Sequence, residues 1–245
     1  MKILAIIPAR GGSKGIPQKN IRLLNGNPLI EYPIKCAKNS KLINRIIVST
    51  DSNKIAKIAR NAGAEVPFLR PKEISNDTAS QLDVLKHTLD FLEKEESYTP
   101  DIITWLHATN PFTTPKTVDK SIKMLKNSKT DLVLGVFRMH AHPYRSFLLE
   151  NNHLKRFSKD FDKYYQRQLY PSLYFPTGDI YTFWYKSFKK YGKIFTPNIT
   201  PLIYEKDEIS INIDTPFDFF VAEMVLKHWN KFKRKFSTGP IVYRR

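Results

Sequence analysis

Residues 4–20 read LAIIPARGGSKGIPQKN, an apolar run followed by a loop with three glycines, two lysines and an arginine. The run at 3–7 is uniformly apolar rather than alternating, which is typical of a strand covered on both faces in a parallel sheet. The loop follows the carboxyl end of this strand, where open α/β sheets usually place their ligand crevice. This stretch therefore predicts an α/β fold with an anion site directly after the first strand.

The loop carries the groups that a polyphosphate requires. It lacks the Gly-Lys-Ser/Thr ending of the nucleotide-triphosphatase loop and the spaced glycines of the dinucleotide fingerprint. Its glycines let main-chain N–H groups approach an anion, its serine adds a hydroxyl donor, and three cations supply the countercharge: Gly11, Gly12, Gly15, Ser13, Arg10, Lys14 and Lys19. The alternative is a glycine-rich turn beside a solvated basic patch, and Lys14 in particular fits either reading.

Length and composition limit the class of protein. The chain of 245 residues, 41% of them hydrophobic, can bury one substantial core, so we expect a single domain over 1–245. Its one cysteine, Cys36, excludes a disulfide framework and leaves no cysteine-based zinc spacing. The apolar stretch at the start is too short for a secretion signal, and no later run could span a bilayer. These features indicate a soluble cytoplasmic protein.

The net charge of +17 suggests nucleic acid, anionic membranes or acidic small molecules as partners. The lysines are widely spread, and the densest group lies at 227–235, with two arginines at 244–245. One interpretation is a solvated last helix whose cations complement its dipole. The other is a weak contact with nucleic acid or a membrane surface. No recognised nucleic-acid-binding motif is present, so nucleic acid is the less favoured partner.

The first half of the chain alternates strand and helix patterns, which predicts a doubly wound, mostly parallel sheet with right-handed crossovers. The strands are expected at 3–7, 45–50, 65–69, 102–106, 131–136 and 179–184. The helices are expected at 28–39, 53–61, 80–94, 115–127 and 215–231. Pro28 and Pro115 suit first-turn positions, because the N–H group that proline lacks has no partner there.

The alternation breaks between 139 and 176, where aromatic residues are frequent and no helical period is visible. A segment this apolar is unsuited to a loose loop. We therefore expect an inserted arm at about 139–178 that packs on a second subunit, which makes the protein a homodimer.

Several segments in the right order resemble the acylneuraminate, or CMP-sialic acid type, cytidylyltransferase family. The first loop is the most specific, and the resemblance runs from residue 3 to about residue 225. The later matching segments are STD at 49–51, RP at 70–71, NDTAS at 76–80, LHATNPF at 106–112, QRQ at 166–168, GDIY at 178–181 and NIDTPFD at 212–218.

The resemblance implies a reaction in which the anomeric hydroxyl of an acid sugar attacks the α-phosphate of CTP and releases pyrophosphate. Positioning and electrostatics would supply most of the catalysis. Arg10 and Lys19 would contact the triphosphate as the catalytic residues. The other nucleotide-binding residues would be Ala9, Gly11, Gly12, Ser13, Asn20, Arg70, Ala79 and Ser80.

The resemblance also implies a magnesium ion, which usually takes one or two protein carboxylates. Asp214 would be the main ligand. Many family members carry a second carboxylate where this chain has Asn212, which leaves one carboxylate and an amide oxygen. Asp218 is a reserve candidate. Without the family, Asp214 is expected to cap the helix that begins near residue 215.

The acceptor side departs most from the family pattern. His107 replaces a family glutamine and is either an altered sugar contact, even a general base, or a hydrogen-bonded histidine at a strand end. Asn110 replaces a family serine. Arg145, Arg167 and Gln168 would reach the neighbouring subunit, where arginine suits the sugar carboxylate. The alternatives are another small acid, such as another ulosonic acid or a phosphonate, or a nucleotide- or nucleic-acid-binding protein without turnover.

Overall fold

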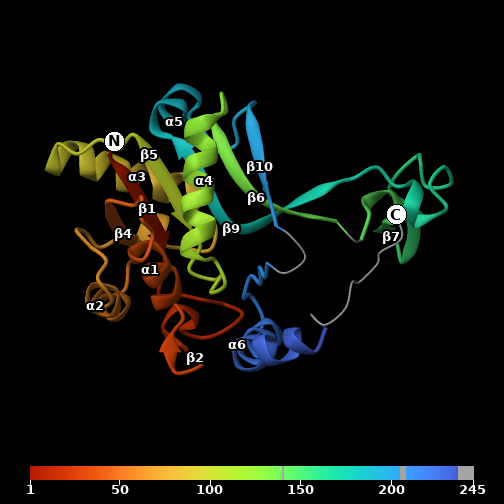
Figure 1. Ribbon diagram of the computed structural model, residues 1–245, viewed down its shortest axis with the longest axis horizontal. Helices are drawn as coiled ribbons and strands as arrows, with labels where there is room; N and C mark the ends of the chain where they lie inside the picture. Colours follow the sequence, from red (N-terminus) through yellow and green to blue (C-terminus); the bar gives the residue numbers. More distant parts are fainter. Residues whose placement is uncertain (140, 205–207, 237–245) are drawn as a thin grey trace.

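The computed structural model describes residues 1–139, 141–204 and 208–236, except the side chains of 167 and 233–236. Its centre is a six-stranded sheet in the order β10-β6-β9-β5-β1-β4 (Figure 1). β9 runs antiparallel to both of its neighbours, and the remaining pairings are parallel. The strands are β1 (Ile3–Pro8), β4 (Arg45–Ser49), β5 (Ile102–Leu106), β6 (Leu132–Arg138), β9 (Tyr174–Trp184) and β10 (Ile199–Ile203).

Helices cover both faces of this sheet. They are α1 (Glu31–Lys38), α2 (Asn53–Ala62), α3 (Gln81–Glu96), α4 (Pro115–Asn127) and α5 (Tyr185–Tyr191), while α6 (Pro216–Phe236) lies apart from the sheet and packs in a third cluster with Leu24 and Leu29. Alternate residues of β1 enter two cores: Ile3, Ala5 and Ile7 pack with α1, α2 and α4, while Leu4 and Ile6 pack with α3 and α5. Burial on both faces explains the uniformly apolar first strand and confirms the doubly wound fold.

Helix starts follow the expected capping chemistry. Ser52 caps α2, Thr114 caps α4, and Ser80 forms a capping box with Asp83 at the start of α3. The expected helix at 28–39 was wrong at its start, because it begins only at Glu31. Pro28 lies instead in β3 (Asn27–Pro28), which pairs with β2 (Leu23–Leu24). The dipeptide Asn25-Gly26, with φ of 45° and 84°, makes this tight turn and is a hairpin signal that the prediction missed.

The strand expected at 65–69 was also wrong. Only Glu65 pairs with the sheet, through a single bridge to Ile47. Pro67 has no N–H to donate, so the ladder cannot continue through it. The chain instead turns to place Arg70 beside the end of β4, where its N–H donates to the carbonyl of Thr50 (2.8 Å).

The segment between β6 and β9 projects beyond the sheet as an arm (Figure 1). It contains β7 (Phe147–Glu150) paired with β8 (His153–Arg156), and the short turns η3 (Pro143–Arg145) and η4 (Arg167–Leu169). Aromatic rings pack within the arm, including Tyr144 on Tyr164 with centroids 5.1 Å apart. Many large apolar side chains in and beside the arm are nevertheless exposed, among them Phe147, Leu149, Leu154, Phe157, Tyr165 and Phe175.

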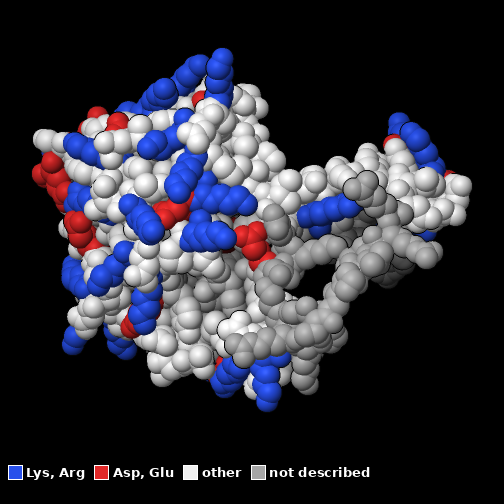
Figure 2. Space-filling model, viewed as in Figure 1, with Lys and Arg blue, Asp and Glu red and all other residues white. Residues whose placement is uncertain are grey.

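Charge is distributed over the surface rather than collected in one band. Lys and Arg side chains are spread across the face shown in Figure 2, with acidic side chains between some of them. Within the basic C-terminal segment, Lys227 pairs with Glu223 (2.8 Å), while the side chains from 233 onward lie outside the described residues. Among the residues described, no helix combines the length and the apolar character needed to cross a bilayer.

Candidate active site

A cavity of about 520 Å³ lies at the carboxyl ends of β1 and β5. This volume is in the usual range for a small-molecule site. Ten of the predicted or loop residues line the cavity: Arg10, Ser13, Lys14, Gly15, Lys19, Asn20, Arg70, Ala79, His107 and Asp214. Segments that are far apart in sequence therefore meet where the first strand ends, as predicted for a parallel sheet.

The first loop is tied down by its own polar groups. The N–H of Gly11 donates to Asp51 Oδ1 (2.7 Å), and Nδ2 of Asn20 donates to the carbonyl of Arg10 (2.9 Å). Asn20 is 5% exposed, and its Oδ1 has no hydrogen-bond partner among the described residues. An unsatisfied acceptor at a cavity wall is suited to a ligand donor, since leaving it empty is costly. Asn20 is thus more than the turn residue that its sequence context suggests.

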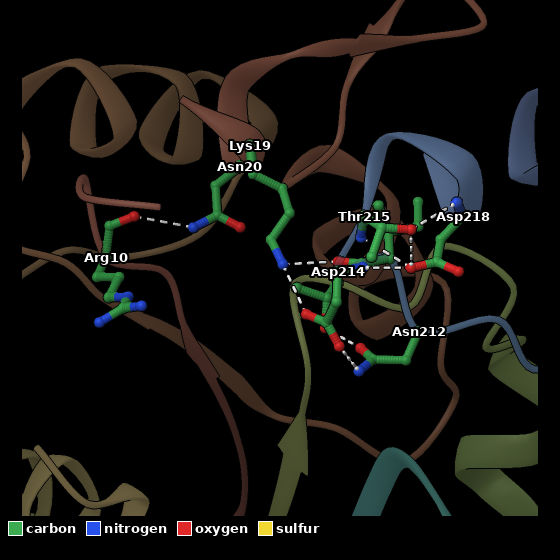
Figure 3. A network of polar contacts seen from close by, with 9 residues as sticks. Arg10, Lys19, Asn20, Asn212, Asp214, Thr215 and Asp218 are labelled. Carbon is green, nitrogen blue, oxygen red and sulfur yellow. Dashed lines mark hydrogen bonds and ion pairs between the residues drawn. The ribbon is translucent and has the colours of Figure 1, made fainter. Parts of the chain in front are cut away.

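Lys19 joins this loop to the C-terminal segment, as Figure 3 shows. Its Nζ donates to the carbonyl of Ile213 (2.6 Å) and to Asp214 Oδ1 (2.8 Å). The other carboxylate oxygen of Asp214 accepts from Nδ2 of Asn212 (2.5 Å), whose Oδ1 accepts from the hydroxyl of Thr109 (2.5 Å). The Lys19 side chain is 12% exposed and that of Asp214 is 62% exposed. The cation is therefore held in place, while the carboxylate remains open to the cavity.

Asp214 does not cap α6, contrary to the expectation from the residue alone. Thr215 and Asp218 form the cap instead: Asp218 Oδ2 accepts from the N–H of Thr215 (2.8 Å), and Thr215 Oγ1 accepts from the N–H of Asp218 (3.2 Å) (Figure 3). This reciprocal pair is the capping-box arrangement. Asp214 is thus free for another role, and Asp218 has a structural one.

Arg70 is an internal cation, 6% exposed, at the cavity wall. One guanidinium nitrogen donates to the carbonyl of Ser49 (2.5 Å), and Nε has no partner among the described residues. Burial lowers the pKa of Arg70 to about 10, although the nearby Asp51 opposes the shift. Arg70 therefore remains charged at neutral pH and retains an unused donor.

His107 lies at the end of β5 with its ring edge-on to Trp105 and Tyr181, at centroid distances of 6.3 Å and 5.3 Å. Burial lowers the pKa of His107 to about 4, and the charge of Asp214 only partly opposes this shift. Its Nε2 has no hydrogen-bond partner among the described residues. At neutral pH the imidazole is thus uncharged, and the residue lines the cavity with one ring nitrogen unpaired among the described residues.

Because the pKa of His107 is low, the stability difference between the wild type and His107→Gln should depend on pH. Between the ordinary pKa of 6.5 and about 4, the unfolded chain binds a proton that the folded chain excludes. The wild type should therefore lose more stability than His107→Gln as the pH falls through this window, and the two curves should run parallel above it. Urea unfolding of both proteins across the window measures the difference, and parallel curves throughout would contradict a neutral buried imidazole.

The remaining predicted residues lie outside the cavity wall. Asn110 is buried and donates to Ser210 Oγ (2.8 Å), which is a structural contact. Ser80 caps α3, and Asn212 positions Asp214. Ala9, Gly11 and Gly12 are likewise not among the described residues that line the cavity.

The side chains of Arg145 and Gln168 make their contacts within the arm. Arg145 donates to the carbonyl of Phe161 (3.2 Å) and lies over its ring, with Cζ 4.0 Å from the centroid. Gln168 donates to Gln166 Oε1 (2.6 Å), and the side chain of Arg167 lies outside the described residues.

Several residues of the cavity wall were not predicted from the sequence. Asn76 and Asp77 line the cavity, as do Gln81, Val84, Trp105 and Thr109. Trp105 is fully buried and its Nε1 has no partner among the described residues. Its position in an apolar strand gave no sign that it would line a cavity. The described residues include no group of three His, Cys, Asp or Glu side chains that could hold a metal alone.

The chain is similar in sequence to known cytidylyltransferases. Residues 4–206 match the family model described as cytidylyltransferase. The chain is 33% identical over 231 residues to a CMP-N,N'-diacetyllegionaminic acid synthase of Legionella pneumophila, covering 93% of this chain and 97% of the relative. It is 30% identical over 228 residues to a pseudaminic acid cytidylyltransferase of Campylobacter jejuni, covering 93% and 97%.

The fold has solved counterparts as well. The structure of a CMP:2-keto-3-deoxy-manno-octonic acid synthetase complexed with CTP aligns with a TM-score of 0.70 at 16% identity, covering 94% of this chain and all of that one. At this identity the match concerns the fold alone.

Proposed function

This chain belongs to the cytidylyltransferase family, and on that basis we propose that it transfers CMP from CTP to a nonulosonic acid and releases pyrophosphate. The observation that carries the proposal is the convergence of Arg10, Lys19 and Arg70 on one cavity beside the open carboxylate of Asp214. The relatives named for legionaminic and pseudaminic acids support the acceptor class.

The cations perform the electrostatic part of this reaction. A transferring phosphoryl group and its leaving pyrophosphate accumulate negative charge that preorganised donors stabilise. Lys19 is fixed by two acceptors and lies 12% exposed, so its charge needs little reorganisation. Arg70, which is 6% exposed, and Oδ1 of Asn20, which has no partner among the described residues, would orient the nucleotide.

His107 would serve the acceptor. Because its pKa is lowered to about 4, the ring is neutral when the enzyme works and can accept a hydrogen bond from a sugar hydroxyl. The same low pKa makes it a weak proton acceptor, so we assign it to orientation of the hydroxyl rather than to general-base catalysis.

A magnesium ion would bind at Asp214. The carboxylate is 62% exposed at the cavity, and magnesium bound to nucleotides often takes a single protein carboxylate with phosphates and water. Asn212 fits less well, because its oxygen accepts from Thr109 and its nitrogen faces Asp214. When bound, the ion would neutralise phosphate charge; Asp214 would hold it, and Asn212 would position Asp214.

Replacing Asp214 tests this assignment. Because Thr215 and Asp218 cap α6, Asp214→Asn should leave the melting temperature nearly unchanged while it lowers activity and raises the magnesium midpoint. Thr215→Ala should show the opposite pattern, costing about 1 kcal/mol of stability with most of the activity kept. Calorimetry and magnesium titrations measure both. A loss of stability in Asp214→Asn that matches its loss of activity would remove the ligand role.

The reaction itself is tested by pyrophosphate release. Purified protein, CTP and magnesium are incubated separately with legionaminic, pseudaminic, neuraminic and 2-keto-3-deoxy-octonic acids. We expect CTP-dependent release with at least one nonulosonic acid and none without an acceptor. Binding of CTP without release for any acid would indicate a nucleotide-binding protein that has lost turnover.

We also infer a cytoplasmic homodimer, supported by the single buried cysteine and by the exposed apolar side chains of the arm. In such a dimer the arm would bring Arg145, Arg167 or Gln168 to the acceptor site of the partner.

Subunit mixing gives the sharpest test of the arm. Two inactive variants, Lys19→Ala and Arg167→Ala, should recover activity when mixed, because each heterodimer has one intact site. Random exchange should restore about a quarter of the wild-type activity for a two-fold dimer. A monomer in sedimentation, or no recovery after proven exchange, would mean that Arg167 does not act across subunits.

A further inference from the structure

The segment at 76–79 carries a carboxylate that occupies two cations of the first loop. Arg10 Nη1 lies 2.8 Å from Asp77 Oδ1, and Lys14 Nζ lies 2.7 Å from Asp77 Oδ2. Arg10 also donates to the carbonyl of Asn76 (3.0 Å). All four residues line the cavity. Asp77 thus presents one oxygen to each cation, as a phosphate group would.

The ion pairs of Asp77 with Arg10 and Lys14 are weak enough for another anion to replace the carboxylate. Hydrogen bonding to Lys14, helped by the charges of Lys14 and Arg10, holds the pKa of Asp77 below its usual value, so the carboxylate is ionised at neutral pH. The side chains of Asp77, Arg10 and Lys14 are 41%, 33% and 79% exposed. Ion pairs this exposed are weak, and a more highly charged anion can displace the carboxylate.

A local turn holds Asp77 in this position. Oδ1 of Asn76 accepts from the N–H (3.0 Å) and the hydroxyl (2.8 Å) of Thr78, and Nδ2 of Asn76 donates to the carbonyl of Glu73 (2.9 Å). The turn lies between η2 (Lys72–Ile74) and the capped start of α3. The Asp77 side chain takes no part in these turn bonds. Its release from the cations therefore leaves the turn and the helix cap intact.

We propose that Asp77 is a placeholder for the nucleotide phosphates, which must displace it from Arg10 and Lys14. The inference rests on the proposed function. A triphosphate carries enough charge to displace the carboxylate, whereas a monophosphate competes poorly. Affinity therefore rises steeply with the number of phosphates, and Asp77 recovers its cations once pyrophosphate has left. The CMP-sugar product, with one phosphate, is then released more readily.

The test compares Asp77→Asn with Glu73→Gln. Glu73 is an exposed carboxylate in the adjacent η2 with no ion pair among the described residues, so its change removes the same charge without touching Arg10 or Lys14. Calorimetric titration with CTP, CMP and inorganic tripolyphosphate measures affinity. Asp77→Asn should bind CTP and tripolyphosphate about three- to tenfold more tightly at low ionic strength, the range that two exposed ion pairs supply. CMP affinity should change less.

Equal effects of Asp77→Asn and Glu73→Gln, or weaker triphosphate binding in Asp77→Asn, would overturn the placeholder. Asp77→Ser, checked by thermal unfolding, repeats the contrast if the first variant is unstable. Tripolyphosphate separates the two proposals, because it contains no base. Tighter tripolyphosphate binding without any CTP binding would reject the proposed function and keep the placeholder. Normal CTP turnover, with Asp77→Asn binding phosphates no more tightly than Glu73→Gln, would keep the proposed function and reject the placeholder.

Discussion

Lys19→Ala and Arg10→Ala should each lower kcat by about two to three orders of magnitude, the usual cost of losing one preorganised electrostatic contact. Lys19 is the better fixed of the two, with acceptors at 2.6 Å and 2.8 Å, so we expect the larger loss there. Among the described residues, the Arg10 guanidinium makes its polar contacts with the exposed segment at 76–77, and it can turn toward a phosphate. Steady-state kinetics at saturating CTP measure both effects.

A charge-matched control is available on α2. Lys54 is exposed and does not line the cavity, so Lys54→Ala removes one positive charge from the same protein without touching the site. Its kcat should stay within about twofold of the wild type, as expected for a surface charge screened by salt. Thermal unfolding should show that Arg10→Ala remains folded. Near-normal kcat in both Arg10→Ala and Lys19→Ala would reject the assignment of this loop to the triphosphate.

The sheet could be predicted because its signal is local and strong. The largely apolar strands β1 and β5 and residues 132–136 of β6 are buried on both faces, and the helix patterns of α2, α3 and α4 were placed within two residues at each end. The two wrong predictions, a strand and a helix start, also have causes in the local sequence. A proline interrupts the expected strand at 65–69, and a two-residue Asn-Gly turn delays the start of α1.

The part of the site that could be predicted consists of residues whose charge or amide group suits a nucleotide. Arg10, Lys19, Asn20, Arg70 and Asp214 meet at the cavity as expected. The sequence could not decide whether Asp214 caps a helix, because Thr215 and Asp218 are equally good caps and only their contacts distinguish them. Nor could it place Asp77, whose partners lie more than sixty residues away.

Gly15→Ala should lower kcat by about two orders of magnitude, through backbone geometry alone. A Cβ at Gly15 would lie closer than 3.0 Å to the carbonyl oxygen of Asp214, and backbone cannot move aside as a flexible side chain would. The loop at 10–19 must therefore separate from the segment that carries Asp214, which displaces Lys19 from its acceptors. A shift of about 1 Å between catalytic groups costs on the order of a hundredfold in rate.

Gly12→Ala is the matched control for this effect, because a Cβ there meets no protein atom within 4 Å. Gly15→Ala should lower the melting temperature, since the overlap strains the junction between the two segments, whereas Gly12→Ala should not. Overpacking of this kind typically costs about 1–3 kcal/mol. The decisive comparison is the Lys19→Ala background: if Gly15→Ala acts by displacing Lys19, the double variant should be little slower than Lys19→Ala alone. Fully multiplicative losses would mean that Gly15 contributes to catalysis by a route other than the position of Lys19.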